Sequence, residues 1–216
     1  SDRVSCLGTV SLDRPDELVE LMRDGRLRGV EVAASVDGEY LGAPRYRPFW
    51  AAVEETGALV LVHPTTRGLG VAALEQHYLW NTVGNPLETT IAAAHLLLEG
   101  VLDEHPGVNI VLAHGGGAIT ALRGRLEHHQ RLRPDGRDVL GGLRRFFYDT
   151  VVLDAEVLRA LVDFAGADRV VVGSDYPFDM GDGRPAEVVR ALGLPAADEE
   201  RILSGNARRL LGQVAG

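Results

Sequence analysis

The chain has 216 residues, of which 45% are hydrophobic and 25% charged, and its formal net charge is −9. This length and apolar content allow a sizeable buried core, whereas no apolar stretch approaches the roughly 18 residues of a transmembrane helix. The excess of acidic groups argues against a nucleic-acid-binding surface, because phosphate binding needs clustered cations.

Cysteine and lysine usage narrow the possibilities further. The one cysteine, Cys6, cannot form an internal disulfide, and no basic segment followed by an apolar run marks a secretory signal. We therefore expect a cytoplasmic protein that does not enter membranes. All 22 cationic side chains are Arg, so these residues offer no Lys for a Schiff base or for a carbamylated ligand that bridges two metals.

Segments typical of strands and helices alternate along the chain. Strands are predicted from β-branched and apolar runs, and helices from amphipathic runs with start signals such as Asp154 ahead of Glu156. The polar, Gly-rich stretch Arg133–Gly142 is the clearest predicted loop. In chain order the predicted elements are strand Ser5–Val10, helix Pro15–Asp24, strand Gly29–Ala33, helix Arg47–Thr56, strand Leu59–His63, helix Pro86–Glu104, strand Asn109–His114, helix Ile119–Leu132, strand Phe146–Val152, helix Asp154–Ala165, strand Arg169–Asp175, and helices Pro185–Leu192 and Asp198–Leu211.

This alternation predicts an α/β fold made of parallel βα units. A (β/α)8 TIM-like barrel needs eight units in about 250 residues, so the six units found here predict a barrel that lacks two. Two helices follow the last strand, and the missing units are therefore expected ahead of the first. The opening SDRVSCLGTV has no initiator Met. We expect a piece of a longer chain, with residues 1–216 forming a single incomplete barrel domain.

Three predicted strands end on a residue that can bind a metal ion or move a proton. These residues are His63 in LVLVHP, His114 in NIVLAHGGG and Asp175 in RVVVGSDYPF. Because the catalytic groups of a parallel barrel lie where its strands end, we expect the three to share one active site. Histidine and carboxylate suit a divalent ion such as zinc, and a second histidine can serve as an acid or base near neutral pH.

Each of the three residues also has a structural explanation. His63 could cap backbone carbonyls where a buried strand ends. His114 precedes Gly115–Gly117, so this segment could be a tight turn or a phosphate-binding loop in which the histidine is incidental. Asp175 could be a helix N-cap. The occurrence of all three at strand ends favours a shared site.

At these positions the chain resembles the amidohydrolase superfamily, in the branch of aminocarboxymuconate-semialdehyde decarboxylase and related non-oxidative decarboxylases. The resemblance extends from Leu7 to Gly212. Its most specific stretches are Val62-His63-Pro64, GNPLETT from Gly84 to Thr90, AHGGG from Ala113 to Gly117, and GSDYPF from Gly173 to Phe178. It implies a barrel of the metal-dependent hydrolase type.

The resemblance also implies roles for the three strand-end residues. It implies that His63 and Asp175 ligate one divalent ion, most often Zn²⁺ with Mn²⁺ as the alternative. His114 would polarise the metal-bound water and act with Asp175 in catalysis. The family's further His-x-His ligand pair is absent from this sequence, which agrees with the two βα units that the strand count lacks.

Substrate binding and assembly are implied by the same resemblance. Arg125 would reach into the neighbouring subunit of a homodimer and hold the substrate carboxylate, a role that suits the planar guanidinium fork. Trp80 and Phe178 would line the pocket, although ordinary aromatic packing explains each of them equally well.

The expected activity is therefore metal-dependent, non-oxidative decarboxylation of a small unsaturated or aromatic carboxylic acid, a carbon–carbon lyase reaction. A hydrolase or hydratase of the same superfamily is the alternative enzyme, since it would use the same activated water. A second alternative is not an enzyme: if the natural chain is as short as these 216 residues, it could be a non-catalytic scaffold subunit.

Overall fold

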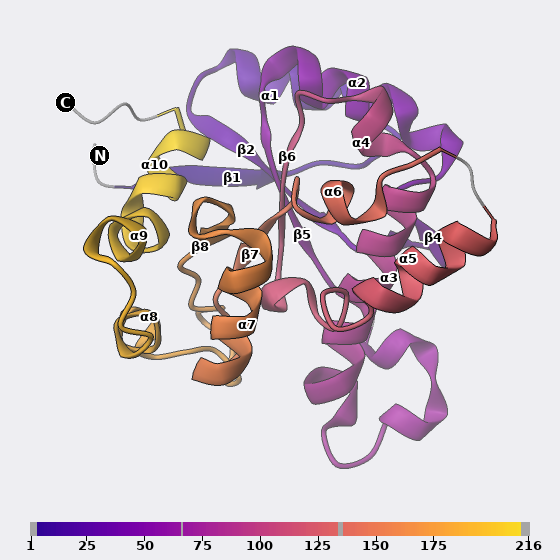
Figure 1. Ribbon diagram of the computed structural model, residues 1–216. Coiled ribbons are helices and arrows are strands. Elements are labelled where there is room, and N and C mark those ends of the chain that lie inside the picture. The colour runs from indigo at the N-terminus through magenta and orange to yellow at the C-terminus, as the bar shows by residue number, and fades with distance from the viewer. Residues whose placement is uncertain (1–3, 66, 134–135, 213–216) are drawn as a thin grey trace.

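Six parallel strands form the framework of the protein in the computed structural model, which describes residues 4–65, 67–133 and 136–212. The sheet order is β1-β2-β5-β6-β7-β8, and helices surround it (Figure 1). The predicted strands and the α/β class are confirmed. The strands are β1 (Cys6–Thr9), β2 (Leu27–Ala33), β5 (Leu59–His63), β6 (Asn109–Leu112), β7 (Phe147–Asp149) and β8 (Val170–Val171).

The order of the strands is that of an incomplete barrel. Each strand pairs in parallel with the next one of the series, and β1 and β8 are the outermost strands. β7 and β8 are shorter than predicted because the Thr150 side chain replaces part of their ladder. Its Oγ1 accepts from the Gly173 N–H at 3.1 Å and donates to the Gly173 carbonyl at 3.3 Å.

Four helices match their predicted ranges to within one residue. They begin where the sequence provides start signals, as at Asp154, whose carboxylate accepts hydrogen bonds from the backbone N–H groups of Glu156 and Val157 at 2.9 Å. These helices are α1 (Pro15–Arg23), α2 (Arg47–Thr56), α7 (Ala155–Ala165) and α8 (Pro185–Ala191).

Three predicted ranges were wrong in detail. Pro86–Glu104 consists of α3 (Asn85–Leu98) and α4 (Val101–Glu104), because Gly100 between them has a φ of 84°. Helix α5 (Arg123–Leu132) begins one turn later than predicted. The last predicted helix is divided into α9 (Ala196–Glu200), a π-helical turn (Arg201–Gly205) and α10 (Asn206–Leu210).

The predicted loop Arg133–Gly142 also contains structure. Helix α6 (Val139–Leu143) begins inside it, with the Asp138 carboxylate accepting from the Gly141 N–H at 2.9 Å as an N-cap. Residues 134–135 of this stretch lie outside the described residues.

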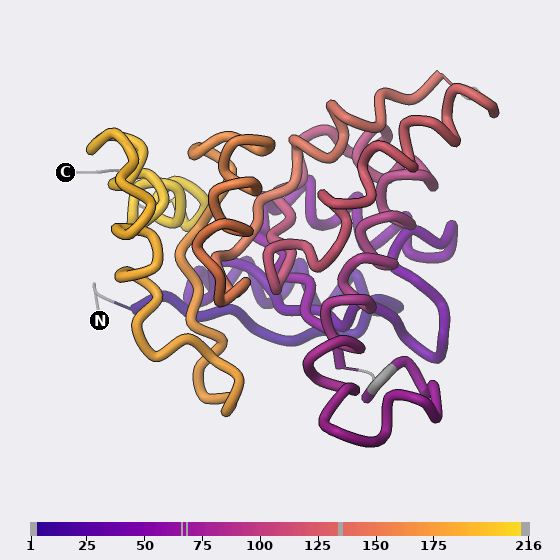
Figure 2. The backbone as a smooth tube through the Cα atoms, turned by 60° about the horizontal axis from the view of Figure 1, so that its bottom comes forward, coloured from indigo at the N-terminus to yellow at the C-terminus, as the bar shows by residue number. Residues whose placement is uncertain are grey.

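Two features between the barrel strands had no predicted counterpart. Strands β3 (Ser35–Val36) and β4 (Glu39–Tyr40) form a short antiparallel hairpin. Asp37 and Gly38 both have positive φ at its turn, and Asp-Gly is the usual pair at such a position. The segment between β5 and α3 contains short 3₁₀ turns and projects from the molecule (Figures 1 and 2).

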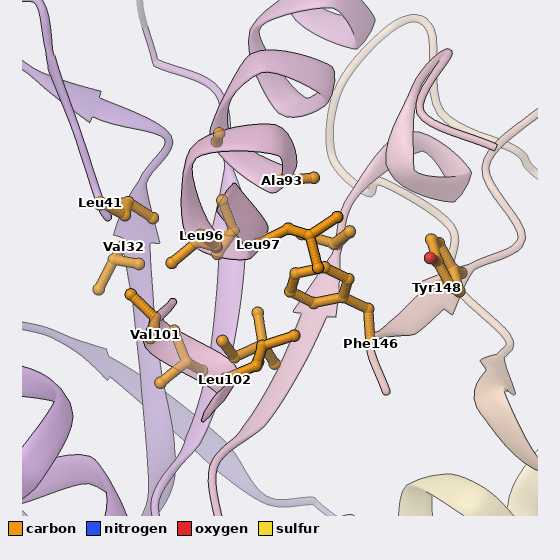
Figure 3. Packing of buried hydrophobic residues seen from close by; sticks show 14 of the residues in the cluster. Val32, Leu41, Ala93, Leu96, Leu97, Val101, Leu102, Phe146 and Tyr148 are labelled. Atoms are coloured by element: carbon orange, nitrogen blue, oxygen red, sulfur yellow. The ribbon is translucent and has the colours of Figure 1, made fainter. Parts of the chain in front are cut away.

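The larger core lies between the outer face of the sheet and the helices. Side chains of α3 and α4, such as Leu96 and Leu102, pack beside Val32 of β2 and Phe146, which precedes β7 (Figure 3). Trp50 on α2 is fully buried, and its indole N–H donates to the Leu41 carbonyl at 2.8 Å.

A smaller core fills the inner face of the sheet. It consists of Leu59, Val111, Phe147 and Val171, with Leu210 and Leu211 from the region of α10 packed against them. Side chains alternate between the two faces of a strand, so Leu59 and Leu61 on the inner face place His63 on the same face. The inner face therefore changes from apolar to polar at the carboxyl ends of the strands.

Candidate active site

His63, His114 and Asp175 meet at the carboxyl ends of β5, β6 and β8. One side-chain donor atom from each lies within 4.8 Å of the other two. The His63 Nε2 is 3.3 Å from the Asp175 Oδ1, and the His114 Nε2 is 4.0 Å from the Asp175 Oδ2. The three side chains are 13–15% exposed, so they are largely enclosed but reachable from solvent.

This arrangement suits a divalent metal ion. Two donors at about 2.1 Å from one tetrahedral ion lie roughly 3.4 Å apart, and the His63 Nε2 and Asp175 Oδ1 are 3.3 Å apart. Two imidazoles and one carboxylate are also a donor set that divalent metals accept. The described residues thus contain a candidate divalent-metal site.

The backbone at Asp175 is unusual for a non-glycine residue. Its φ is 55°, and the residue follows β8 in a turn instead of starting a helix. The N-cap explanation for Asp175 is therefore wrong. The Phe178 ring, three residues further on, stacks on His63 with ring centroids 6.0 Å apart and an interplanar angle of 12°, so Asp175 and Phe178 contact His63 from one loop.

His114 lies on a turn of four successive residues with positive φ, the other three being Gly115, Gly116 and Gly117. A Cβ atom at Gly115 would lie 2.4 Å from the Val152 side chain, and one at Gly117 would lie 2.0 Å from the Pro86 carbonyl oxygen. The glycines are therefore required by close packing as well as by their backbone angles.

The backbone N–H groups of this turn already have acceptors within the protein. Gly115 donates to the Asp149 carboxylate at 2.7 Å, Gly116 to the Ala113 carbonyl at 3.0 Å, and Gly117 to the His114 carbonyl at 2.8 Å. A phosphate-binding loop would present such groups to a ligand. The phosphate-loop interpretation of the glycine triplet is thus not supported by the geometry.

Asp149, at the end of β7, is a site residue that the sequence analysis missed. Its Oδ1 accepts from the Gly115 N–H at 2.7 Å and from the Val151 N–H at 3.1 Å. Burial raises the pKa of Asp149 to about 6, although these hydrogen bonds oppose the change. Its position in the sequence was the signal that could have identified it. Asp149 lies two residues after Phe147, which faces the inner side of the sheet, just as His63 lies two residues after Leu61.

Burial has the opposite consequence for His114. Loss of hydration lowers the pKa of His114 to about 4, the nearby His63 lowers it further, and Asp175 partly offsets both. The His114 imidazole is therefore neutral at physiological pH and has one ring nitrogen free to accept a proton.

These two pKa shifts predict opposite pH dependences of stability in the metal-free protein. The folded pKa of His114 is depressed, so its contribution to the free energy of unfolding is lost as the pH falls from 6.5 to about 4. The folded pKa of Asp149 is raised, so its contribution is lost as the pH rises from 3.8 to about 6. Each effect is on the order of 3 kcal/mol.

Denaturant unfolding of two variants measures these contributions separately. Relative to wild type, His114→Asn is expected to gain stability near pH 4 compared with pH 7, because the histidine no longer has to stay neutral. Asp149→Asn is expected to gain stability near pH 7 compared with pH 4. Parallel stability profiles for either variant and the wild type would contradict the corresponding shift.

Two cavities adjoin the site, and Asp175 lines both. One, of about 340 Å³, lies over the inner face of the sheet and includes His63, Asp149 and Phe178. The other, of about 240 Å³, includes His114. Apart from His114 and Asp175 the second cavity is lined by Asn81, Thr82, Pro86, Gly117, Val151, Val152, Leu153, Val157 and Met180.

The remaining predicted site residues lie in different places. Phe178 is in the site, but Trp80 lines neither cavity and instead packs against Tyr78 and under the Arg67 guanidinium, 4.8 Å from its ring centroid. Arg125 is exposed on α5, in a mostly apolar groove lined by residues of that helix and by Leu122, which precedes it. The structure therefore brings together four of the six predicted site residues.

Comparison with known proteins identifies the family. The protein-family model described as Amidohydrolase matches residues 2–213 of the chain. The chain belongs to the amidohydrolase family. This amidohydrolase is 32% identical over 86% of its length to 2-amino-3-carboxymuconate-6-semialdehyde decarboxylase of Dictyostelium discoideum, and 29% identical over 97% of its length to gamma-resorcylate decarboxylase of Rhodococcus jostii. The predicted resemblance to this decarboxylase branch is confirmed.

Solved structures agree on the fold. The crystal structure of 2,6-dihydroxybenzoate decarboxylase in complex with 2,6-dihydroxybenzoate superposes with a TM-score of 0.84 at 26% identity, covering 96% of this chain and 70% of that one. The amidohydrolase chain spans 54% of the Dictyostelium relative and 70% of the Rhodococcus relative. The predicted partial barrel is thus confirmed. Within the described residues, no helix is long and apolar enough to cross a bilayer.

Proposed function

We propose that this amidohydrolase is the catalytic part of a metal-dependent decarboxylase that removes CO₂ from a small unsaturated or aromatic carboxylic acid without an oxidant. The observation that carries the proposal is the meeting of His63, His114 and Asp175 at three strand ends. The names of the similar proteins support the substrate class, since each is a decarboxylase of such an acid.

In this proposal His63 and Asp175 hold the metal. Their facing donor atoms have the separation that one ion requires, and the stacked Phe178 ring restricts the orientation of His63. A bound divalent ion would supply Lewis acidity toward an oxygen atom in the site. We prefer Zn²⁺ to Mn²⁺ because two imidazole nitrogens are nearby. Competition between the two ions, followed by metal analysis of the purified protein, tests this preference.

His114 is the proposed proton carrier. Decarboxylation breaks a carbon–carbon bond, and the electron pair left on carbon must be taken up by a proton while CO₂ departs. A neutral imidazole can accept a proton from water and then deliver it to carbon. The hydroxide left by that water combines with the departing CO₂ as bicarbonate, so the step balances. The Nε2 of His114 is 4.0 Å from the Asp175 Oδ2, and both residues line the smaller cavity, which supports a role of this nitrogen next to the substrate.

The decisive experiment is product analysis. The metal-loaded protein is incubated with carboxyl-labelled aromatic and enoic acids in D₂O, with His114→Ala as the control. Release of labelled CO₂ with deuterium at the former carboxyl carbon is the expected result. Net addition of water, without CO₂, would instead identify a hydrolase or hydratase, and absence of turnover in the full natural protein would favour a non-catalytic subunit.

Substrate carboxylate binding is the basis of the proposed homodimer. Among the described residues no arginine lines either cavity at the site, so a guanidinium for the carboxylate has to come from elsewhere. Arg125 is exposed, and the groove around it is largely apolar, with Leu122 38% and Leu132 69% exposed. We propose that this face of α5 packs against a second copy and that Arg125 enters its site.

Arg125→Ala is expected to raise KM at least tenfold, since a charge-assisted hydrogen bond to a carboxylate contributes about 1.5–3 kcal/mol. Metal content is expected to stay at the wild-type value because Arg125 lines neither of the two cavities at the donor cluster. Steady-state kinetics and metal analysis check both. Arg133→Ala serves as the control. Full activity from a protein that sedimentation shows to be a monomer would contradict the role of Arg125.

Two broader expectations stay with this proposal. We infer that residues 1–216 form one incomplete barrel domain, which the single six-stranded sheet from β1 to β8 supports. We also retain the cytoplasm as the expected location, on the basis of the single cysteine, Cys6.

A further inference from the structure

The first turns of α3 pack directly against the turn that carries His114. This part of α3 belongs to the GNPLETT stretch, whose residues have no place in the proposed chemistry so far. Thr89 is fully buried and Thr90 is 5% exposed. Buried hydroxyl groups need hydrogen-bond partners. The Thr89 hydroxyl has a partner in His114, and the Thr90 hydroxyl has one in Ala118, the residue directly after the turn.

Thr90 shows how a hydroxyl of this helix is oriented. Its Oγ1 donates to the Pro86 carbonyl at 2.7 Å, four residues earlier in the chain, and accepts from the Ala118 N–H at 2.8 Å. The direction of the second bond is certain because a backbone N–H can only donate. The hydroxyl proton thus points back along the helix, and the oxygen lone pair points to the turn.

Thr89 has the same arrangement with a histidine ring in place of the backbone N–H. Its Oγ1 donates to the Asn85 carbonyl at 3.2 Å, again four residues earlier, and lies 3.5 Å from the His114 Nδ1. A hydroxyl has one proton. With that proton directed to Asn85, the bond to the ring requires the His114 Nδ1 to carry a proton and donate it.

The other ring nitrogen is then without a proton. In a neutral imidazole only one nitrogen carries hydrogen, so an Nδ1–H tautomer leaves a lone pair on the Nε2. That atom lies 4.0 Å from the Asp175 Oδ2, and both residues line the smaller cavity. The ring is further restricted by its backbone, because the Asp149 carboxylate holds the N–H of the next residue, Gly115.

We propose that Thr89 is a positioning residue that fixes His114 in the Nδ1–H tautomer, with the lone pair of its Nε2 directed at the reacting centre. Its importance for catalysis rests on the proposed function, because it prepares the nitrogen that is to accept a proton. The tautomer itself is a property of the folded chain and can be measured without turnover.

Nitrogen NMR of protein labelled with ¹⁵N at histidine distinguishes the two ring nitrogens near neutral pH, and His114→Gln identifies the signals of this residue. The wild type is expected to show a protonated Nδ1 and an unprotonated Nε2. Thr89→Ser, which keeps the hydroxyl, is expected to preserve this pattern, whereas Thr89→Val is expected to shift His114 toward the Nε2–H form. A wild-type His114 in the Nε2–H form would overturn the proposal even if Thr89→Val failed to fold.

Kinetics of the full natural enzyme provide the second readout. Thr89→Val is expected to lower kcat about tenfold with KM changed less than twofold, and Thr89→Ser to restore most of kcat. Thr56→Val is the matched control, because its Oγ1 makes the same bond to the Ala52 carbonyl, at 2.7 Å, in α2. Normal kcat in Thr89→Val would overturn the positioning role. The two readouts can also disagree. If Thr89→Val changes the His114 tautomer but the wild-type enzyme has no decarboxylase activity, the tautomer assignment is correct and the proposed function is refuted.

Discussion

Replacing His114 with alanine in the full natural enzyme is expected to lower turnover by about 10²–10⁴-fold, the usual contribution of a positioned proton-transfer group. Fold and metal content are expected to persist, because His63 and Asp175 remain and provide the better-spaced pair of donors. Turnover per metal-loaded site is the quantity to measure. Retention of more than about a tenth of normal turnover would refute the proposed role of His114.

His63→Ala is the comparison that separates proton transfer from metal binding. Removing one of two facing donors is expected to lower metal content together with rate, and added metal is expected to restore part of the activity. No such rescue is expected for His114→Ala. If His114 only supported the glycine turn, its loss would reduce stability and leave near-normal turnover in the folded fraction.

Gly117→Ala is expected to lower the free energy of unfolding by about 3 kcal/mol or more. The backbone of Gly117 has φ 62° and ψ −127°, which is accessible mainly to glycine. An added Cβ would lie 2.0 Å from the Pro86 carbonyl oxygen and 2.5 Å from the Thr90 Oγ1. Because this pushes the His114 turn away from α3, activity in the folded fraction is also expected to fall.

Gly124→Ala is the matched control for this variant. Gly124 lies in α5, and nothing lies within 4 Å of the position that its Cβ would occupy. Alanine is a better helix former than glycine, so a gain of about 0.5–1 kcal/mol is expected. Urea unfolding of both variants gives the comparison. Equal stabilities of Gly117→Ala and wild type would mean that the turn and α3 are not packed closely.

The three strand ends with a residue that can bind a metal or transfer a proton could be predicted because each depends on local sequence. An apolar run predicts a strand, and the parallel βα order places the carboxyl ends of all strands at one side. His63, His114 and Asp175 follow from these two rules. The divided helices were not predictable to the same degree, since a single residue such as Gly100 ends one helix without interrupting the amphipathic pattern.

The supporting residues of the site depend on contacts that no local pattern records. Asp149 is separated by 34 positions from the Gly115 N–H that it binds, and Thr89 by 25 positions from His114. Their side chains are ordinary for a strand end and for a helix. Only the packing of α3 and β7 around the glycine turn shows that both control the backbone or the ring of His114.

The hydrogen bonds between the β8 region and the segment that leads into α10 have a consequence for association with other molecules. An outermost strand exposes backbone groups that can pair with a foreign extended segment and start aggregation. At and just after β8 two such groups are already engaged: the Asn206 Nδ2 donates to the Val170 carbonyl at 2.7 Å, and the Val172 N–H donates to the Ile202 carbonyl at 3.0 Å. The turn before α10 and the first residue of that helix thus reduce the number of backbone groups that this edge of the sheet offers for intermolecular pairing.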